Sequence, residues 1–202
     1  MDKSACPERP PGYGGRVFTP TLPIRTERLE LRLFRREDFA DSFAYHSRAD
    51  VARYLYQEPR TPTEYEAILN SKITHTGFAA AGDRINLALV PHDLGRVVGD
   101  VMLLWTSSEH RQGEIGFILH PDYHGRGYAH EASEVLLRLG FDGLGLHRIQ
   151  GRLDGRNTAS ARVLEKLGMR REAHLVENEF IKGEWTDEVV YAILHREWLQ
   201  RS

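Results

Sequence analysis

The sequence lacks several features that mark particular classes of protein. Its single cysteine, Cys6, cannot form an internal disulfide. Lys and Arg together number 27 against 29 Asp and Glu, so the chain has no basic excess of the kind that nucleic-acid binding requires. No apolar run is long enough to cross a bilayer, and the first residues lack the apolar core of a signal peptide. These absences predict a soluble cytoplasmic protein with no nucleic-acid or membrane partner.

Metal-binding motifs are also missing from the sequence. The chain has 10 histidines, but His120, His124 and His130 do not form an i, i+4 helical pair, and no cysteine cluster accompanies them. We therefore expect no metal site.

Composition divides the chain into two parts. Residues 1–23 are rich in Pro and Gly and show no apolar periodicity, which predicts a flexible N-terminal arm or a segment ordered only by packing on the body of the protein. The remainder, residues 24–202, is long enough to bury a core and suits a single domain.

Apolar periodicity predicts an alternation of strands and helices. Strands are expected at 29–33, 84–90, 97–104, 114–119, 146–153, 171–181 and 184–194. Helices are expected at 38–47, 63–78, after residue 129 and at 157–167, with a shorter helix or turn at 50–56. Thr63 and Glu66 have the spacing of a capping box, and Gly168 stands where a helix end favours glycine. The order indicates a mixed α+β domain with one sheet, in which the strands 114–119 and 146–153 run parallel.

The stretch from 114 to 132, EIGFILHPDYHGRGYAHEA, combines a strand, a turn with Gly125 and Gly127, and a helix. The first amides of a helix lack partners and its dipole makes that end positive, so such a turn can hold an anion. The turn is not a Walker loop, because no Gly-Lys-Ser/Thr follows, and it is not a dinucleotide fingerprint, because the third glycine is missing. It is also compatible with a plain connection.

Two segments give the chain a family resemblance. HGRGYA before a helix, followed after the next strand by RNTASARVLEKLGM, resembles the GNAT superfamily of acyl-CoA N-acyltransferases. The closing IKGEWTDEVVYAILHREW is similar to the branch that holds the ribosomal-protein N-terminal acetyltransferases and the related polyamine and antibiotic acetyltransferases. The resemblance covers residues 26–198. It implies the GNAT fold, a single twisted and mostly antiparallel sheet with a central splayed pair of parallel strands and flanking helices, and it is compatible with a homodimer.

The resemblance implies acetyl-CoA as co-substrate. Its pyrophosphate would lie at the glycine turn, and its pantetheine arm would pair with an open edge of the central strand, where an amide of Phe117 or Ile118 would also stabilise the thioester oxyanion. Asn157 matches the asparagine that binds pantetheine in the family, although an N-cap explains an Asn there as well. The residues expected to contact the coenzyme are Phe117, Ile118, Leu119, His124, Gly125, Arg126, Gly127, Tyr128, Ala129 and Asn157.

The implied reaction is direct transfer of an acetyl group to an amine, which is helped by a base for the amine and a proton for the leaving thiolate. Glu114 is the candidate base, acting directly or through water, and its alternative is a solvent-facing strand residue. Ser160 resembles the serine proposed as the acid in the N-terminal acetyltransferases, and its alternative is a first-turn serine bonded to backbone. Leu164 stands where some members of the branch have a tyrosine acid, so that role cannot be carried over.

The acceptor pocket is expected between residues 54–58 and the hairpin turn at 182–185. Glu58 and Glu109 are expected to attract a cationic amine. The candidate walls are Tyr54, Tyr56, Trp105 and Trp185, although aromatics of this kind are more often core residues.

These observations predict an N-acetyltransferase that moves an acetyl group from acetyl-CoA to a primary amine. A protein or peptide N-terminus is the leading acceptor class, and small cationic amines such as polyamines or aminoglycosides are the alternative. A second hypothesis is an acyl-CoA-binding sensor that has lost turnover, which Leu164 favours and which Glu114 and Ser160 oppose.

Overall fold

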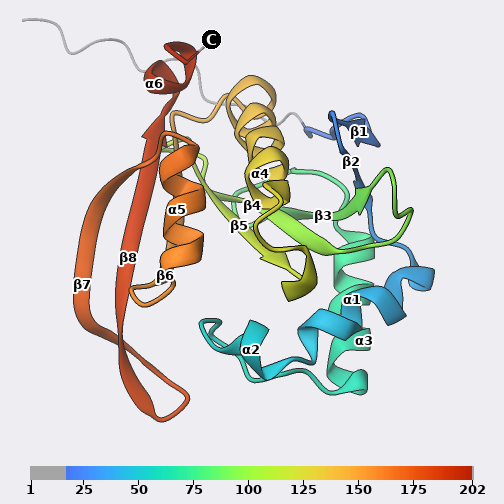
Figure 1. The fold of residues 1–202 in the computed structure, drawn as a ribbon. Helices are drawn as coiled ribbons and strands as arrows, with labels where there is room; N and C mark the ends of the chain where they lie inside the picture. The colour runs from blue at the N-terminus through green and yellow to red at the C-terminus, as the bar shows by residue number, and fades with distance from the viewer. Residues whose placement is uncertain (1–16, 202) are drawn as a thin grey trace, which may run out of the picture.

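A mixed sheet of eight strands organises residues 17–201, the part of the chain that the computed structural model describes (Figure 1). The strands are β1 (Ile24–Arg25), β2 (Leu29–Leu33), β3 (Arg84–Pro91), β4 (Gly99–Ser107), β5 (Gln112–Leu119), β6 (Arg148–Asp154), β7 (Arg170–Ile181) and β8 (Glu184–Leu194). Their order in the sheet is β1-β2-β3-β4-β5-β6-β8-β7. β5 and β6 run parallel and the other neighbours run antiparallel, so the predicted mixed sheet is confirmed.

Helices cover both faces of this sheet (Figure 1). They are α1 (Phe39–His46), α2 (Ala49–Ala52), α3 (Pro62–Thr74), α4 (Tyr128–Arg138), α5 (Thr158–Lys166) and α6 (His195–Leu199), with short helical turns η1 (Arg36–Asp38), η2 (Pro121–Tyr123) and η3 (Leu139–Gly143). Leu136 of α4 and Leu164 of α5 belong to one hydrophobic cluster, and Tyr65 of α3 belongs to another. Leu87 and Ala88, neighbours in β3, join opposite clusters, as the period of a strand requires. Within residues 17–201, no helix is both long and apolar enough to span a bilayer.

The parallel strands β5 and β6 diverge after a short contact. They pair from Gln112–Glu114 to Arg148–Gln150, whereas β5 continues to Leu119 and β6 continues to Asp154. The predicted splay is therefore confirmed. It leaves an open edge at the carboxyl ends of the two strands, which is where sheets of this kind bind ligands.

The capping box of α3 differs from its predicted position. Thr61, rather than Thr63, is the N-cap: its Oγ1 accepts a hydrogen bond from the Glu64 amide at 3.4 Å, and a Glu64 carboxylate oxygen accepts one from the Thr61 amide at 2.9 Å. The prediction of Thr63 with Glu66 is thus wrong by two residues. Pro62 explains the difference, because it occupies the first helical position, where a missing N–H costs nothing.

α3 also ends earlier than predicted, at Thr74 instead of near Phe78. Phe78 is not part of the helix, because its backbone exchanges two hydrogen bonds of 2.8 Å with the backbone of Phe18. The predicted arm thus contributes a contact to the domain through Phe18. Residues 1–16 of that arm lie outside the described residues.

Candidate functional site

The glycine turn before α4 leaves a run of backbone amides free. Gly125 and Gly127 have φ angles of 75° and 81°, in the left-handed region that glycine adopts without strain. Among the described residues, no backbone hydrogen bond uses the amides from 125 to 130, and a Cβ added at Gly125 would meet nothing within 4 Å. The turn therefore offers free amides, the positive end of α4 and open space, which together fit the diphosphate of coenzyme A.

The side chains of the turn hold its shape. The His124 ring nitrogen Nε2 lies 3.1 Å from the carbonyl oxygen of Leu119 at the end of β5. The exposed Arg126 guanidinium is stacked on a neighbouring tyrosine ring, 5.2 Å from its centroid. Tyr128 is buried in the core, and Ala129 packs against it. The structure thus brings all the residues predicted from this turn to one place, with Arg126 as its exposed cation.

The open edge of β5 presents alternate amides to the gap beside β6. The Arg111 carbonyl accepts hydrogen bonds from the amides of His147 and Arg148, where β6 begins, whereas the His120 amide donates to the carbonyl oxygen of Val98, just before β4, at 2.8 Å. Because successive amides of a strand point to opposite edges, the amides of Phe117 and Leu119 face the gap and that of Ile118 faces β4. Of the two amides predicted to meet the thioester oxygen, the Phe117 amide is therefore the one at the open edge.

Glu114 lies where the two parallel strands separate. It is half-buried, and the Gln150 side-chain amide donates to its Oε2 at 3.0 Å. Glu114 and Gln150 also form the last pair of the parallel ladder. A carboxylate that is fixed at the mouth of the gap is well placed to receive a proton from an amine that enters it.

Asn157 and Ser160 lie at the start of α5. The Asn157 Oδ1 accepts a hydrogen bond from the Ser160 amide at 3.1 Å, so the N-cap that the sequence suggested is present. Ser160 itself is half-buried in the first turn. Leu164 is buried against Gly151 of β6, where an added Cβ would lie 2.9 Å from the leucine methyls. At the position where some members of the branch have a tyrosine acid, this chain therefore has a leucine that packs in the core.

The tip of the β7–β8 hairpin touches the segment that ends α2. The Lys182 ammonium donates a hydrogen bond to the carbonyl oxygen of Ala52. Ala52 lies two residues before the segment 54–58, so this contact joins the hairpin turn to the neighbourhood of the other segment that was predicted to border the acceptor pocket.

Tyr56 faces the hairpin from the segment after α2. Burial, together with the carboxylates of Glu179 and Glu188, raises the pKa of Tyr56 to about 12, although the Arg152 guanidinium acts in the opposite direction. The phenol therefore stays protonated at neutral pH and can donate a hydrogen bond.

Carboxylates from β7 and β8 surround Arg152 of β6 near Tyr56. Arg152 forms ion pairs with Glu188 and, at 3.3 Å, with Glu179, and the Asn178 side-chain amide donates to Glu188 at 2.8 Å. These carboxylates, with Glu114 acting over a longer distance, raise the pKa of Arg152 above its ordinary value, with the Glu188 hydrogen bond as the largest cause. Around Arg152, three carboxylates therefore face one guanidinium, and this local negative surplus favours a cationic ligand.

The sequence analysis missed Glu179 and Glu188. It selected Glu58 and Glu109 instead, as carboxylates that would attract a cationic amine. The register of β7 against β8 shifts between Leu175 and Glu179, so regular pairing across the hairpin turn does not predict which side chains lie together. The signal in the sequence that could have identified Glu179 and Glu188 is that both are charged residues on strands next to the predicted pocket.

The aromatic candidates separate into two groups. Tyr54 is half-buried beneath the Arg53 guanidinium, which lies 5.2 Å from its ring centroid. Trp185 is 60% exposed and meets the Phe180 ring edge-on at 5.3 Å. Trp105, by contrast, is 4% exposed in the main core, and its indole N–H donates to a backbone carbonyl at 3.0 Å. We therefore remove Trp105 from the candidate pocket, because its side chain is packed inside the protein.

Residues 17–201 contain no group of three or more His, Cys, Asp or Glu side chains arranged to hold an ion.

Comparison with known proteins shows what this chain resembles. Residues 28–170 match the family described as "Acetyltransferase (GNAT) domain". The uncharacterized N-acetyltransferase YnaD of Bacillus subtilis (strain 168) is 32% identical over 178 residues, which cover 88% of this chain and 99% of YnaD.

Solved structures give the same picture. A GNAT-family acetyltransferase from Bacillus anthracis is 33% identical, with a TM-score of 0.77, and the match covers 86% of this chain and 99% of that one. The spermidine N-acetyltransferase of Vibrio cholerae, solved in complex with CoA and spermine, is 26% identical, with a TM-score of 0.73 and the same two coverages, 86% and 99%.

Proposed function

This chain belongs to the GNAT family of acetyl-CoA-dependent N-acetyltransferases, and we propose that its acceptor is a small amine with more than one positive charge. The observation that carries the proposal is the negative surplus of Glu114, Glu179 and Glu188 against Arg152 on the acceptor side. The similar Vibrio cholerae enzyme is a spermidine N-acetyltransferase, which agrees with an acceptor of this charge.

The coenzyme side of the proposal uses the glycine turn and the open edge of β5. Bound acetyl-CoA supplies the acetyl group as a thioester. The free amides around Gly125 and Gly127 would hold the pyrophosphate. The amides of Phe117 and Leu119 would pair with the pantetheine arm, and the Phe117 amide is the candidate donor to the thioester oxygen. Asn157 would contact the same arm through the atoms that its capping bond leaves available.

The chemical roles fall to Glu114 and Ser160. Glu114, oriented by Gln150, would accept the proton of the incoming ammonium, directly or through one water. Ser160 would donate a proton to the leaving thiolate. Tyr54, Tyr56 and Trp185 would form the walls against which the carbon chain of the amine lies.

Thiol release from acetyl-CoA over a panel of amines tests the acceptor. The panel contains spermidine, several aminoglycosides, and short peptides with Ala, Ser and Met N-termini, and mass spectrometry identifies the product. Turnover of the polycationic amines without turnover of the peptides is expected. Selective turnover of a peptide would instead support an N-terminal acetyltransferase, the acceptor class that the sequence favoured first. Acetyl-CoA binding with no turnover would support the sensor hypothesis.

A pair of hairpin variants tests the carboxylates directly. Glu179→Gln should raise the KM for the amine about fivefold and leave the KM for acetyl-CoA unchanged, since a partly exposed ion pair contributes up to about 1 kcal/mol. Glu172→Gln is the matched control, because Glu172 lies on the same strand, β7, but away from the hairpin turn, and pairs with Arg148. Equal effects of both variants on the amine would contradict the role of Glu179.

A further inference from the structure

Arg28, immediately before β2, reaches across to the glycine turn. Its Nη1 donates a hydrogen bond to the carbonyl oxygen of Arg126 at 2.7 Å, and its guanidinium lies 5.4 Å from the centroid of the Tyr128 ring. A Cβ added at Gly127 would lie 3.2 Å from its Nη2. The Arg28 guanidinium therefore covers one side of the turn that is proposed to hold the pyrophosphate.

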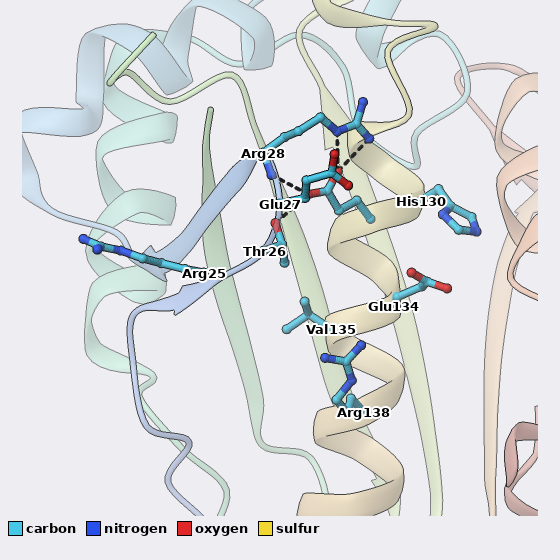
Figure 2. A pocket seen from close by; sticks show the side chains of 9 residues that line it. Arg25, Thr26, Glu27, Arg28, His130, Glu134, Val135 and Arg138 are labelled. Atoms are coloured by element: carbon cyan, nitrogen blue, oxygen red, sulfur yellow. Dashed lines mark hydrogen bonds and ion pairs between the residues drawn. The ribbon is translucent and has the colours of Figure 1, made fainter. Parts of the chain in front are cut away.

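Glu131, in the first turn of α4, fixes this guanidinium. One of its carboxylate oxygens accepts hydrogen bonds from Arg28 Nε at 2.7 Å and Nη2 at 2.6 Å, and the other accepts from the Arg28 amide at 2.9 Å and the Thr26 hydroxyl at 2.6 Å. Dashed lines mark these interactions beside the labelled Arg28 and Thr26 in Figure 2. Burial alone would raise the pKa of Glu131, but these hydrogen bonds outweigh it and lower the pKa below its ordinary value. The carboxylate is thus a paired anion that faces β2.

The bond from Arg28 sets the direction of one amide in the turn. The carbonyl and the following N–H of a trans peptide point in opposite directions. Because the carbonyl of Arg126 points to Arg28, the N–H of Gly127 points away from Arg28, toward the open side of the turn. Glycine adopts several φ values without strain, so its own conformational preference does not fix the φ of 81° at Gly127. A hydrogen bond from outside the turn is therefore needed to hold this peptide in place.

We propose that Arg28, held by Glu131, is a positioning residue that aims the Gly127 amide at the pyrophosphate of coenzyme A. This inference rests on the proposed placement of the coenzyme. Arg28 acts here through geometry rather than charge: Glu131 balances its charge, and all three of its guanidinium nitrogens are engaged by the protein.

Calorimetric binding of coenzyme A to the full-length protein tests the proposal. Arg28→Gln should weaken binding about tenfold, the value expected when a hydrogen bond to a charged group is lost. Arg28→Lys should fail to restore it, because an ammonium cannot reach both Glu131 and the Arg126 carbonyl as a fork does. Arg25→Gln is the matched control: Arg25 precedes the same turn of chain but pairs with Glu30, and it should bind like the parent.

Glu131→Gln separates geometry from charge. It removes an anion near a bound diphosphate, so a purely electrostatic role predicts tighter binding, whereas loss of the clamp predicts binding weaker by about threefold or more. The parent and all variants should use S-acetylpantetheine, which lacks the pyrophosphate, with kcat/KM values within about twofold of each other.

Three results would overturn the inference while the proposed function stands. The first is an Arg28→Gln or Arg28→Lys variant that binds coenzyme A like the parent, and the second is a Glu131→Gln variant that binds it more tightly. The third is a loss of activity in the variants that is as large with S-acetylpantetheine as with acetyl-CoA. A parent protein that binds no coenzyme A would overturn the proposed function, and this inference with it.

Discussion

Asp100, on β4, is the centre of a buried group of charged residues behind the site. Its carboxylate accepts hydrogen bonds from the Tyr45 hydroxyl at 2.9 Å and the Lys72 ammonium at 2.8 Å, and it lies 3.1 Å from His46 Nε2. Burial would raise the pKa of Asp100, but Lys72 and His46 together lower it well below its ordinary value. The carboxylate is thus charged in the folded protein, and Lys72 is its counterion. Asp100 pairs with Ile118, so this group braces the strand that is proposed to carry the coenzyme.

His46 should make the protein less stable in weak acid. Burial lowers the pKa of His46 in the folded state, although Asp100 opposes that shift, whereas the unfolded value is about 6.5. The unfolded state therefore binds the proton more readily. This contribution is complete above about pH 6.5 and is lost as the pH falls through the folded pKa, by up to about 1.4 kcal/mol per pH unit.

Urea unfolding between about pH 5 and 8 measures this effect. Compared with the parent, His46→Gln should show a shallower fall of the free energy of unfolding toward acid. Parallel curves for the two proteins would show that His46 keeps the same pKa in the folded and unfolded states.

Glu114→Gln tests the proposed base. We expect kcat/KM for the amine to fall about a hundredfold, at the low end of what a positioned base contributes, while the affinity for coenzyme A stays the same. The glutamine keeps the shape of the side chain and its contact with Gln150, so folding should be unaffected. A rate within about twofold of the parent at every pH would make Glu114 an ordinary strand residue.

At the scale of elements, two glycines with similar backbone conformation test whether the glycine turn between β5 and α4 holds the coenzyme. Gly125 and Gly82 both have positive φ angles, 75° and 100°, and a Cβ added to either would meet nothing within 4 Å. A glutamate at either position costs about 1 kcal/mol of stability, because a side chain is strained there. Gly125→Glu should also weaken coenzyme A binding about a hundredfold, since it places an anion where the diphosphate would lie. Gly82→Glu should bind like the parent, and equal losses in both variants would contradict the placement of the coenzyme.

Elements with strong periodic patterns were predictable from the sequence. α5 starts and ends within one residue of its predicted bounds, because Asn157 caps one end and Gly168, with a φ of 74°, follows the other. The glycine turn was predictable for the same reason, since its glycines and the apolar face of α4 are local features. The start of α3 was harder to predict, because both Thr61 and Thr63 have a glutamate three residues later. Pro62 favours Thr61 as the N-cap, because proline is well suited to the first helical position.

The acceptor side could not be predicted in this way, because it depends on contacts between elements far apart in the sequence. Arg152 on β6 meets Glu188 on β8 and Glu179 on β7 across a shifted register. The clamp of Arg28 on Glu131 joins residues that are 103 positions apart. Local patterns report neither kind of contact.

At the scale of the whole molecule, the splay of β5 from β6 joins the two halves of the site. The coenzyme side comes from β5, α4 and α5, and the acceptor side comes from the segment after α2 and the β7–β8 hairpin (Figure 1). The two halves of the sheet are joined through the short parallel pairing of Gln112–Glu114 with Arg148–Gln150. A coenzyme that lies in the gap would therefore add hydrogen bonds where β5 and β6 have few with each other.

Coenzyme A should consequently protect alternate amides of β5 from hydrogen exchange. The amides of Phe117 and Leu119 face the gap, so saturating coenzyme A should slow their exchange strongly, whereas the Ile118 amide is already bonded to β4 and should change only with global stability. The stability gain itself should reach about 2.7 kcal/mol at a hundredfold excess over Kd. Amide-resolved exchange with and without coenzyme A measures both quantities. Equal protection of all three amides would mean that the ligand stabilises the protein without pairing along this edge.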